Sequence, residues 1–306
     1  MKIGMYKDFS IFITTRDRLK ELQYTIETLH PYLEKGVNLL ICDDGSKDGT
    51  YEFLKSNYSS IQIIRNETSR GLIYSRNKLL SQIQTKYGIS LDDDLNFLTS
   101  DPFPFLYNHF EQEISCAVAS FRIFWSLNRP ESFLSYDKVH RVKSYAGGAH
   151  AIRMQAWNDI PDYPEWFVFY GEEDYASYHL LKKGWEVHYI PEVLTHHRVD
   201  NKKRKSDKDY TQRLRRNLRS GWFLYFIFFP WDIVTQKLSY SLWMQFRKVG
   251  QGNFAAGKAT VLALFDTIMA IKRLKKNRFP LTPTEYDLLL SLPAVKLYWK
   301  PETNKK

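Results

Sequence analysis

The stretch GISLDDDLNF at residues 88–97 is the strongest indication of the fold in this sequence. A short apolar run leads into three consecutive carboxylates, Asp92, Asp93 and Asp94, and further apolar residues follow. This pattern is typical of a strand whose carboxyl end carries the acids, where open α/β sheets bind their ligands. Adjacent negative charges repel one another unless a cation or solvent compensates them. The stretch therefore predicts a site for Mg²⁺ or Mn²⁺, and the alternative is a solvated acidic turn.

Upstream of this stretch, apolar strand-like runs alternate with segments of helical periodicity. The strand-like runs lie at residues 9–15, 37–42 and 61–64. The helical patterns that follow them lie at residues 16–29, 51–56 and 72–83, and we expect His30-Pro31 to end the first helix. Continuous apolar strands that alternate with helices are typical of a parallel sheet covered on both faces. The fold class is therefore predicted to be α/β.

A second acidic pair, Asp43 and Asp44, follows the second strand-like run in the sequence CDDGSKDGT. In a right-handed doubly wound sheet the carboxyl ends of parallel strands open on one edge, so both acidic tips should meet there. A nucleotide fits this arrangement, because one acid can accept hydrogen bonds from a base or ribose while the other holds a metal on the diphosphate. The alternative for this pair is a turn that caps the next helix.

Composition limits the class of protein. The 306 residues are 43% hydrophobic and 25% charged, which suits one large domain, alone or with an appendage. Cys42 and Cys116 lie in apolar runs, so we expect buried free thiols in a reducing compartment. We expect no secretory signal, and the apolar run at residues 221–229 stops at Pro230, too short to span a membrane.

Charge divides the chain into two parts. Residues 1–200 hold 22 Lys/Arg and 27 Asp/Glu, whereas residues 201–306 hold 22 Lys/Arg and 7 Asp/Glu. The predicted division is therefore a domain at 1–200, with halves at 1–97 and 98–200, and a basic amphipathic helical region at 201–306. Because the first part is acidic, the basic total does not indicate a nucleic-acid partner.

Six motifs in series resemble the family 2 glycosyltransferases of the GT-A fold. They are TTRDR, CDDGSKDGT, SRGLIYSRN, LDDD, GGAHAIR and YGEEDYASYHLLKKGW, which start at residues 14, 42, 69, 91, 147 and 170. The resemblance covers roughly residues 8–200. It implies a GT-A domain, a Rossmann-like and mostly parallel sheet flanked by helices, with a C-terminal helical appendage.

The resemblance also implies a nucleotide site and a metal site. The positions that match nucleotide-binding segments are Thr14, Arg16, Asp43, Asp44, Arg70, Arg76, Asp92 and Asp93. Asp44 is favoured for the base or ribose, and the arginines suit phosphate because of their bidentate geometry. Asp92 and Asp94 form the Asp-x-Asp metal motif, with Asp94 favoured for direct coordination. His197 would complete the metal shell, with His196 as a weaker alternative.

An acceptor hydroxyl needs a carboxylate base on the other side of the sugar. Glu172, Glu173 and Asp174 are the candidates, and the match does not separate them cleanly. Glu173 is favoured and Asp174 is second. The alternative is an acidic first helical turn stabilised by the helix dipole.

The resemblance places the acceptor-binding segment at Gly147 and Gly148, where a side chain would block approach. Trp166 and Tyr170 are the aromatic residues favoured for sugar contact, because sugar rings pack on aromatic faces. The region at residues 122–145 has little periodicity and is expected to form a substrate-covering loop.

The resemblance thus implies an inverting, metal-assisted transferase that uses a nucleoside diphosphate sugar, with UDP favoured, and acts by direct displacement. The acceptor would be a hydroxyl of a glycan or lipid-linked glycan in cell-surface polysaccharide or lipopolysaccharide assembly. A nucleotidyltransferase is disfavoured because TTRDR is not a Gly- and Lys-rich phosphate loop. A non-catalytic RNA- or membrane-binding module would leave the first 200 residues without a role. A processive synthase would need spanning helices.

The basic C-terminal region has two compatible interpretations. Aromatic and basic residues at 208–229 and an amphipathic pattern at 253–276 suit the surface of an anionic bilayer. The enzyme would then be cytoplasmic and held at the inner face of the cell membrane. The other interpretation is a helical subdomain that packs on the catalytic domain with solvated charges.

Overall fold

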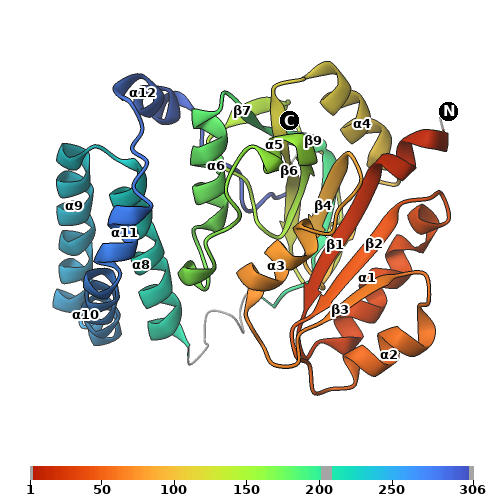
Figure 1. The fold of residues 1–306 in the computed structure, drawn as a ribbon, viewed down its shortest axis with the longest axis horizontal. Helices are drawn as coiled ribbons and strands as arrows, with labels where there is room; N and C mark the ends of the chain where they lie inside the picture. Colours follow the sequence, from red (N-terminus) through yellow and green to blue (C-terminus); the bar gives the residue numbers. More distant parts are fainter. Residues whose placement is uncertain (1–2, 201–208, 303–306) are drawn as a thin grey trace.

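The computed structural model describes residues 3–200 and 209–302, and the basic run at 201–205 lies outside these residues. Figure 1 shows a twisted sheet with helices packed against it, and the C-terminal helices (blue) form a further layer beside α6 (Glu172–Lys182). One sheet has the strand order β3-β2-β1-β4-β8-β6-β9-β5, and β7 pairs with β9. The predicted α/β class with C-terminal helices is therefore confirmed.

The first half of the sheet is parallel, as the apolar runs predicted. Its strands are β1 (Phe9–Thr15), β2 (Asn38–Asp43), β3 (Gln62–Arg65) and β4 (Tyr87–Leu91). The connecting helices are α1 (Leu19–Leu33), α2 (Thr50–Asn57) and α3 (Leu72–Leu80). Because β2 and β4 both pair with β1 in parallel register, their acidic tips open on the same edge of the sheet.

The second half of the sheet is mixed. Its strands are β5 (Leu95–Phe97), β6 (Cys116–Trp125), β7 (His140–Val142), β8 (Ala149–Arg153) and β9 (Glu186–His197). The strand β8 runs antiparallel between β4 and β6, and β5 pairs antiparallel with β9. The expectation of a mostly parallel sheet therefore holds for the nucleotide half alone. The shorter helical elements are η1 (Ile3–Asp8), α4 (Phe103–Gln112), α5 (Met154–Asn158) and η2 (Glu165–Phe167).

Prolines inside a helix and a strand do not end these elements. The helix α1 begins at Leu19 and continues through Pro31 to Leu33. A proline so close to the end removes only one helical hydrogen bond, and the buried Tyr32 keeps the last turn in place by donating to the Ser100 carbonyl oxygen at 2.9 Å. In β9, the register shifts opposite the segment that holds Pro191, so the strand continues past it to His197.

Apolar side chains fill both faces of the sheet. One core contains α1 and α4, and the other contains α3, α5 and α6. The C-terminal helix α8 (Tyr210–Phe228) joins the second core through Phe223, Ile227 and Phe228. The apolar run at residues 221–229 is therefore largely buried against the face of the sheet that α3, α5 and α6 cover. No helix among the described residues has both the length and the apolar character needed to cross a bilayer.

The remaining helices are α9 (Trp231–Gly250), α10 (Phe254–Met269), α11 (Ile271–Lys276) and α12 (Pro283–Ser291). The amphipathic pattern at 253–276 was expected as one helix, but it divides at Ala270, and Leu274 of α11 is buried in the core that α8 also joins. After α12 the chain returns to the sheet, where the Trp299 N–H donates to the Ile123 carbonyl oxygen of β6 at 2.9 Å. The predicted boundary at residue 200 stays a prediction.

Candidate active site

The three acids after β4 point in different directions. Asp92 accepts a hydrogen bond from Arg76 at 3.1 Å. Asp93 is buried and accepts from the Thr15 hydroxyl at 2.8 Å. Burial raises the pKa of Asp93 to about 7, although Arg18 opposes this rise. The acidic tip of β4 is therefore a set of separately bound carboxylates and not a solvated turn.

Asp94 lies between two cationic partners. Its Oδ2 atom is 2.6 Å from Arg18 Nη2, and its Oδ1 atom is 2.9 Å from His197 Nε2. Burial alone would raise the pKa of Asp94, but the hydrogen bonds and charges of these two residues outweigh it and hold the pKa below its usual value. Asp94 is therefore ionised at neutral pH. Arg18 was not among the predicted site residues, although it is the last residue of the TTRDR motif.

Asp92, Asp94 and His197 could together hold a metal ion. Their ligand atoms all lie within 4.8 Å of one another. The pairing of Leu95 with His197 at the end of β9 places this imidazole beside the acids. His197 Nδ1 is buried and has no hydrogen-bond partner among the described residues. Two carboxylates and an imidazole suit Mn²⁺ or Mg²⁺, so the predicted residues fit a divalent cation.

His196 and Trp125 complete the surroundings of His197. The strand alternation turns His196 away from Asp94, and its Nε2 atom lies 2.8 Å from the Ser126 carbonyl oxygen. The ring of Trp125 lies 4.1 Å from that of His197 and fixes its orientation. Trp125 was missed as a site residue because only the folded sheet brings the end of β6 beside the end of β9.

Arg76 joins the two halves of the site. Its Nη2 atom contacts Asp92 and donates to the Gly147 carbonyl oxygen at 3.0 Å. Its Nη1 atom lies 3.5 Å from a Glu172 oxygen and 3.6 Å from a Glu173 oxygen. Burial would lower the pKa of Arg76, but the three surrounding carboxylates raise it. One buried guanidinium therefore holds the acidic tip of β4 within reach of the acidic first turn of α6.

Two glycines allow this close approach. A Cβ atom on Gly147 would lie 1.8 Å from Glu173 Oε1, and one on Gly148 would lie 2.7 Å from Asp92 Oδ2. The Gly148 carbonyl oxygen also accepts from the Asp92 N–H at 2.9 Å. The glycine pair therefore lies between the acid tip of β4 and the acids of α6, where a side chain would displace both carboxylates.

The three acids of α6 differ in their surroundings. Glu172 is fully buried, and Glu173 has a side chain 20% exposed. Burial raises the pKa of both, and their mutual repulsion adds to this rise for Glu173, while Arg76 opposes it. Asp174 instead accepts a hydrogen bond from Ser144, and burial raises its pKa. Glu173 is therefore the acid of this turn that is both beside Arg76 and partly open to solvent.

Asp44 organises the loop before α3. Its two oxygens accept from the Ser69 hydroxyl at 2.7 Å and from the backbone N–H groups of Arg70 and Gly71 at 2.8 and 2.9 Å. They also accept from Asn66 and Ser75. Burial opposes ionisation, but these hydrogen bonds lower the pKa of Asp44. Both oxygens of Asp44 are thus engaged by this loop. Its contact with a base or ribose stays a prediction.

The other predicted nucleotide residues line the same edge of the sheet. Thr14 is half-buried, Arg16 is exposed and donates to Ser69 at 2.9 Å, and Arg70 is exposed. Asp43 is buried and accepts from the Ser46 N–H at 3.1 Å, which closes the turn. Arg16 and Arg70 therefore have cationic groups available beside the loop that Asp44 organises.

Trp166 and Tyr170 lie in the loop that leads into α6. The helix α8 holds this loop, because Arg219 donates to the Phe167 carbonyl oxygen and Ser220 donates to the Phe169 carbonyl oxygen at 3.2 Å. Trp166 packs on Phe223 of α8 with its ring 5.0 Å away, so it faces the C-terminal helices. These α8 contacts were missed because nothing in the local sequence indicates which loop a distant helix supports.

A second cluster with metal-ligand atoms lies near the opposite edge of the sheet, at the start of β6. Here His109, Cys116 and His188 come together. His188 lies 2.9 Å from both His109 and Glu186, so the two imidazoles and the carboxylate satisfy one another in a hydrogen-bonded chain. Cys116 is a buried free thiol, and burial raises its pKa to about 12. This cluster is therefore a structural contact between α4, β6 and β9.

This chain is similar to known glycosyltransferases in sequence and in fold. Residues 10–155 match the family model described as glycosyl transferase family 2. These residues belong to glycosyl transferase family 2. The family 2 match begins in β1 and ends just after β8, so it contains Arg76, the acids after β4 and the glycine pair.

A curated relative is a UDP-Glc:alpha-D-GlcNAc-diphosphoundecaprenol beta-1,3-glucosyltransferase, WfaP, from Escherichia coli. It is 24% identical over 203 residues, which cover 62% of this chain and 76% of the relative.

Three solved structures share the GT-A fold. GalNAc-T7 with UDP, GalNAc and Mn²⁺ has a TM-score of 0.58 at 16% identity, over 75% of this chain and 49% of that one. Residues 1–349 of TarS from S. aureus give 0.55 at 15% identity, over 88% and 82%. The mannosyltransferase PcManGT from Pyrobaculum calidifontis, with GDP-Man and Mn²⁺, gives 0.53 at 12% identity, over 93% and 79%.

Proposed function

We propose that this family 2 glycosyltransferase moves a sugar from a nucleoside diphosphate to a hydroxyl of a glycan or lipid-linked glycan, with inversion at the sugar carbon. The observation that carries this proposal is the position of Arg76. Its guanidinium contacts Asp92 on the donor side and lies beside Glu173 on the acceptor side. A donor and an acceptor bound on either side of Arg76 would be close enough to react.

Asp94, Asp92 and His197 would hold the divalent cation. When bound, the cation would neutralise the charge that grows on the departing diphosphate. Mn²⁺ is present in two of the similar structures, GalNAc-T7 and PcManGT, which supports a divalent cation here. Arg18 keeps Asp94 ionised and oriented, so we propose it as a positioning residue for this site.

Glu173 is proposed as the base. Its carboxylate takes the acceptor hydroxyl proton as the acceptor oxygen bonds to the sugar carbon, while the bond to the diphosphate oxygen breaks on the opposite face. Glu172 is buried behind it and raises its basicity through repulsion. Asp174 is the weaker candidate because Ser144 binds it.

The residues proposed to surround the nucleotide are Thr14, Arg16, Asp43, Asp93 and Arg70. Asp44 would hold the loop before α3 in place beside them. UDP is favoured as the carrier because the curated relative is named for UDP-Glc. Gly147 and Gly148 would lie beneath the acceptor sugar, and Tyr170 would contact it.

We further propose that the acceptor is presented at the cytoplasmic face of the membrane. The relative acts on a diphosphoundecaprenol-linked sugar, which supports a lipid-linked acceptor in surface glycan assembly. Both cysteines of this chain are free, as in a reducing compartment. The helices α9 and α10 carry exposed aromatic residues beside basic ones, which suits an anionic bilayer surface. No nucleic acid is proposed.

Donor hydrolysis without acceptor tests this function. We expect slow, Mn²⁺-dependent release of nucleoside diphosphate, and we expect Asp94→Asn to reduce it by about 10²-fold because a charged ligand is lost. Asp162→Asn, which removes an exposed acid from a surface loop, is the matched control and should behave as the parent. Release of pyrophosphate would indicate a nucleotidyltransferase, and metal-independent release would contradict the proposal.

A further inference from the structure

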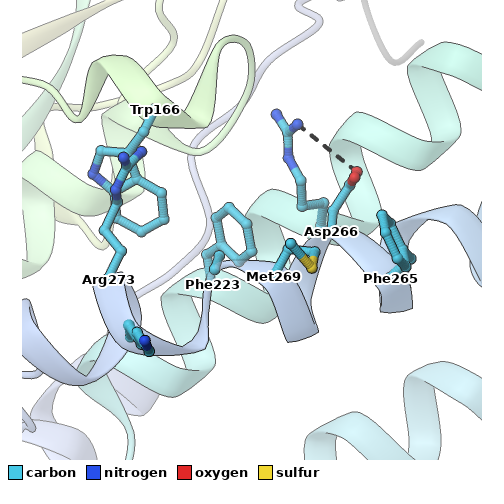
Figure 2. Close-up of a pocket in the computed structure, with 9 residues that line it drawn as sticks. Trp166, Phe223, Phe265, Asp266, Met269 and Arg273 are labelled. Carbon is cyan, nitrogen blue, oxygen red and sulfur yellow. Dashed lines mark ion pairs between the residues drawn. The ribbon is translucent and has the colours of Figure 1, made fainter.

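A cavity that none of the candidate catalytic acids lines lies between the loop before α6 and the C-terminal helices. Its volume is about 460 Å³. Figure 2 shows Trp166 on one wall facing Arg273, with Phe223, Met269, Asp266 and Phe265 along the other side. The cavity therefore combines apolar walls with charged groups.

The cavity is positively charged. Arg219, Lys272 and Arg273 line it, and Asp266 is the acid among its lining residues. The charge of Asp266 is already paired, because Arg215 binds its two oxygens at 2.7 and 2.6 Å. No ion pair to Lys272 or Arg273 is formed within residues 3–200 and 209–302. Both cations are therefore available to an anionic ligand.

Two of these cations are already oriented. The Arg273 guanidinium lies 5.5 Å above the Trp166 ring, which holds it over the cavity. Arg219 has a side chain only 13% exposed, and its Nε–H is buried with no hydrogen-bond partner among the described residues. A buried, unsatisfied N–H of a charged group is costly, so an acceptor oxygen at this position would be stabilising.

An apolar surface extends from the mouth of the cavity along α10. Phe265 and Met269 line the cavity and are still 59% and 69% exposed, and Val261 and Ile268 of the same helix are 66% and 67% exposed. The basic helix α11 follows directly after α10, and exposed apolar side chains beside basic ones are typical of contact with a bilayer. A ligand with an anionic group and a hydrocarbon chain would match both features.

The cavity is also connected to the catalytic acids. Its Trp166 wall belongs to the loop at residues 165–171, and Arg219 binds that loop at the Phe167 carbonyl oxygen. The loop ends at Gly171, the residue before Glu172. An acceptor held by its phosphate in the cavity would therefore have its sugar end close to the loop that leads into α6, the helix of the proposed base.

We propose that this cavity binds the phosphate or diphosphate group of a lipid-linked acceptor, with Lys272, Arg273 and Arg219 as its cationic ligands and α10 beside the lipid chain. This inference rests on the proposed function and names the acceptor class more closely. Guanidinium and ammonium groups on an apolar wall recognise phosphate by charge-assisted hydrogen bonds.

Vesicle binding by the full chain tests the proposal. Phosphatidylcholine vesicles would be doped with polyprenyl monophosphate or, at matched surface charge, with phosphatidylglycerol. We expect tighter binding to the polyprenyl phosphate vesicles. The variant Lys272→Ala/Arg273→Ala should lose this preference, with about a tenfold weaker affinity.

The matched control is Lys275→Ala/Lys276→Ala, which removes the same charge from the same helix outside the cavity. It should keep the preference for polyprenyl phosphate. Inorganic pyrophosphate added as a competitor should reduce the preference, because it offers the same anion without the lipid.

Three results would overturn the inference. They are equal binding to both kinds of vesicle, equal losses in both double variants, and a preference that pyrophosphate leaves unchanged. Donor hydrolysis by the unaltered chain is measured alongside. If Mn²⁺-dependent release of nucleoside diphosphate is observed while the preference is absent, the cavity proposal fails and the proposed function stands. If that release is absent, the proposed function itself fails.

Discussion

At the scale of single residues, the acids of α6 make a pH prediction. Burial and Glu172 raise the pKa of Glu173 well above its usual value of about 4.3. Glu173 therefore becomes a carboxylate, the form that can accept a proton, only as the pH rises through this raised pKa. We expect kcat/KM for sugar transfer to fall as the pH is lowered. The midpoint of this fall should lie well above the pKa of an ordinary glutamate.

The variant Glu173→Gln should lose about 10²- to 10⁴-fold in transfer because it cannot accept the proton. Glu165→Gln, in the preceding exposed turn, is the control and should keep both the rate and the pH profile. A Glu173→Gln enzyme that retains the parental pH profile would assign the base to another group.

The glycine pair makes a prediction that separates function from stability. A methyl group on Gly147 would collide with Glu173 Oε1, which is the free end of a side chain and can rotate away. We expect Gly147→Ala to lower the free energy of unfolding by only about 1 kcal/mol but to reduce transfer by about 10²-fold, since the base is displaced.

Gly221→Ala in α8 is the matched control, because a Cβ atom there meets no atom within 4 Å. It should raise the free energy of unfolding by about 0.5–1 kcal/mol and leave transfer unchanged. Denaturant titration and transfer rates, measured on both variants, check this pair. Unchanged transfer in Gly147→Ala would contradict the close packing of Gly147 against the proposed base.

Single residues also show how far sequence reasoning reaches. The acids after β4, Glu173 and the glycines could be predicted because each belongs to a contiguous motif. Arg18, Trp125 and Arg219 could not, because their roles depend on contacts between segments far apart in the chain. Asp44 shows a role that its motif did not indicate, because its oxygens also hold the loop before α3 together.

At the scale of elements, the last segment of the chain is an unexpected part of the sheet. Trp299 is almost fully buried beside β6, and the Arg122 guanidinium lies 4.4 Å above its ring. We expect Trp299→Ala to lower the free energy of unfolding by about 3 kcal/mol, because a large buried side chain is lost. Denaturant titration would measure this change.

Tyr298→Ala is the control, because Tyr298 is 59% exposed, and it should change stability by less than about 1 kcal/mol. Equal effects of the two variants would show that the segment does not pack on β6 in solution.

Element boundaries were predicted well where apolar periodicity was strong, as in β1, which spans the predicted residues 9–15. The predicted end of the first helix at His30-Pro31 was wrong, because tertiary packing of Tyr32 overcame the local preference of proline. The break between α10 and α11 at Ala270 carries no such signal in the sequence, because alanine favours helix.

At the scale of the whole molecule, an acidic catalytic part and a strongly basic C-terminal part are joined in one chain. The aromatic residues Tyr240, Trp243 and Phe246 of α9 are 64%, 60% and 71% exposed, and α9 lies at the outer edge of the helical layer (Figure 1). Spacings of three residues place them on one face of the helix. A basic and aromatic face of this kind combines the two attractions that hold a protein on an anionic bilayer, charge and apolar burial.

These two attractions predict different responses to salt. Flotation with phosphatidylglycerol vesicles should recover the full chain at low salt and much less of it at high salt, because the Debye length falls from about 10 Å at 0.1 M to about 3 Å at 1 M. The fraction that remains at high salt reports apolar insertion. Trp243→Ala/Phe246→Ala should remove that fraction and leave the low-salt attraction, whereas Phe105→Ala, 48% exposed on α4, should change neither. Absence of the unaltered chain from the floating fraction at low salt would mean that the helical layer only packs on the catalytic half. The acceptor would then have to reach the site from solution.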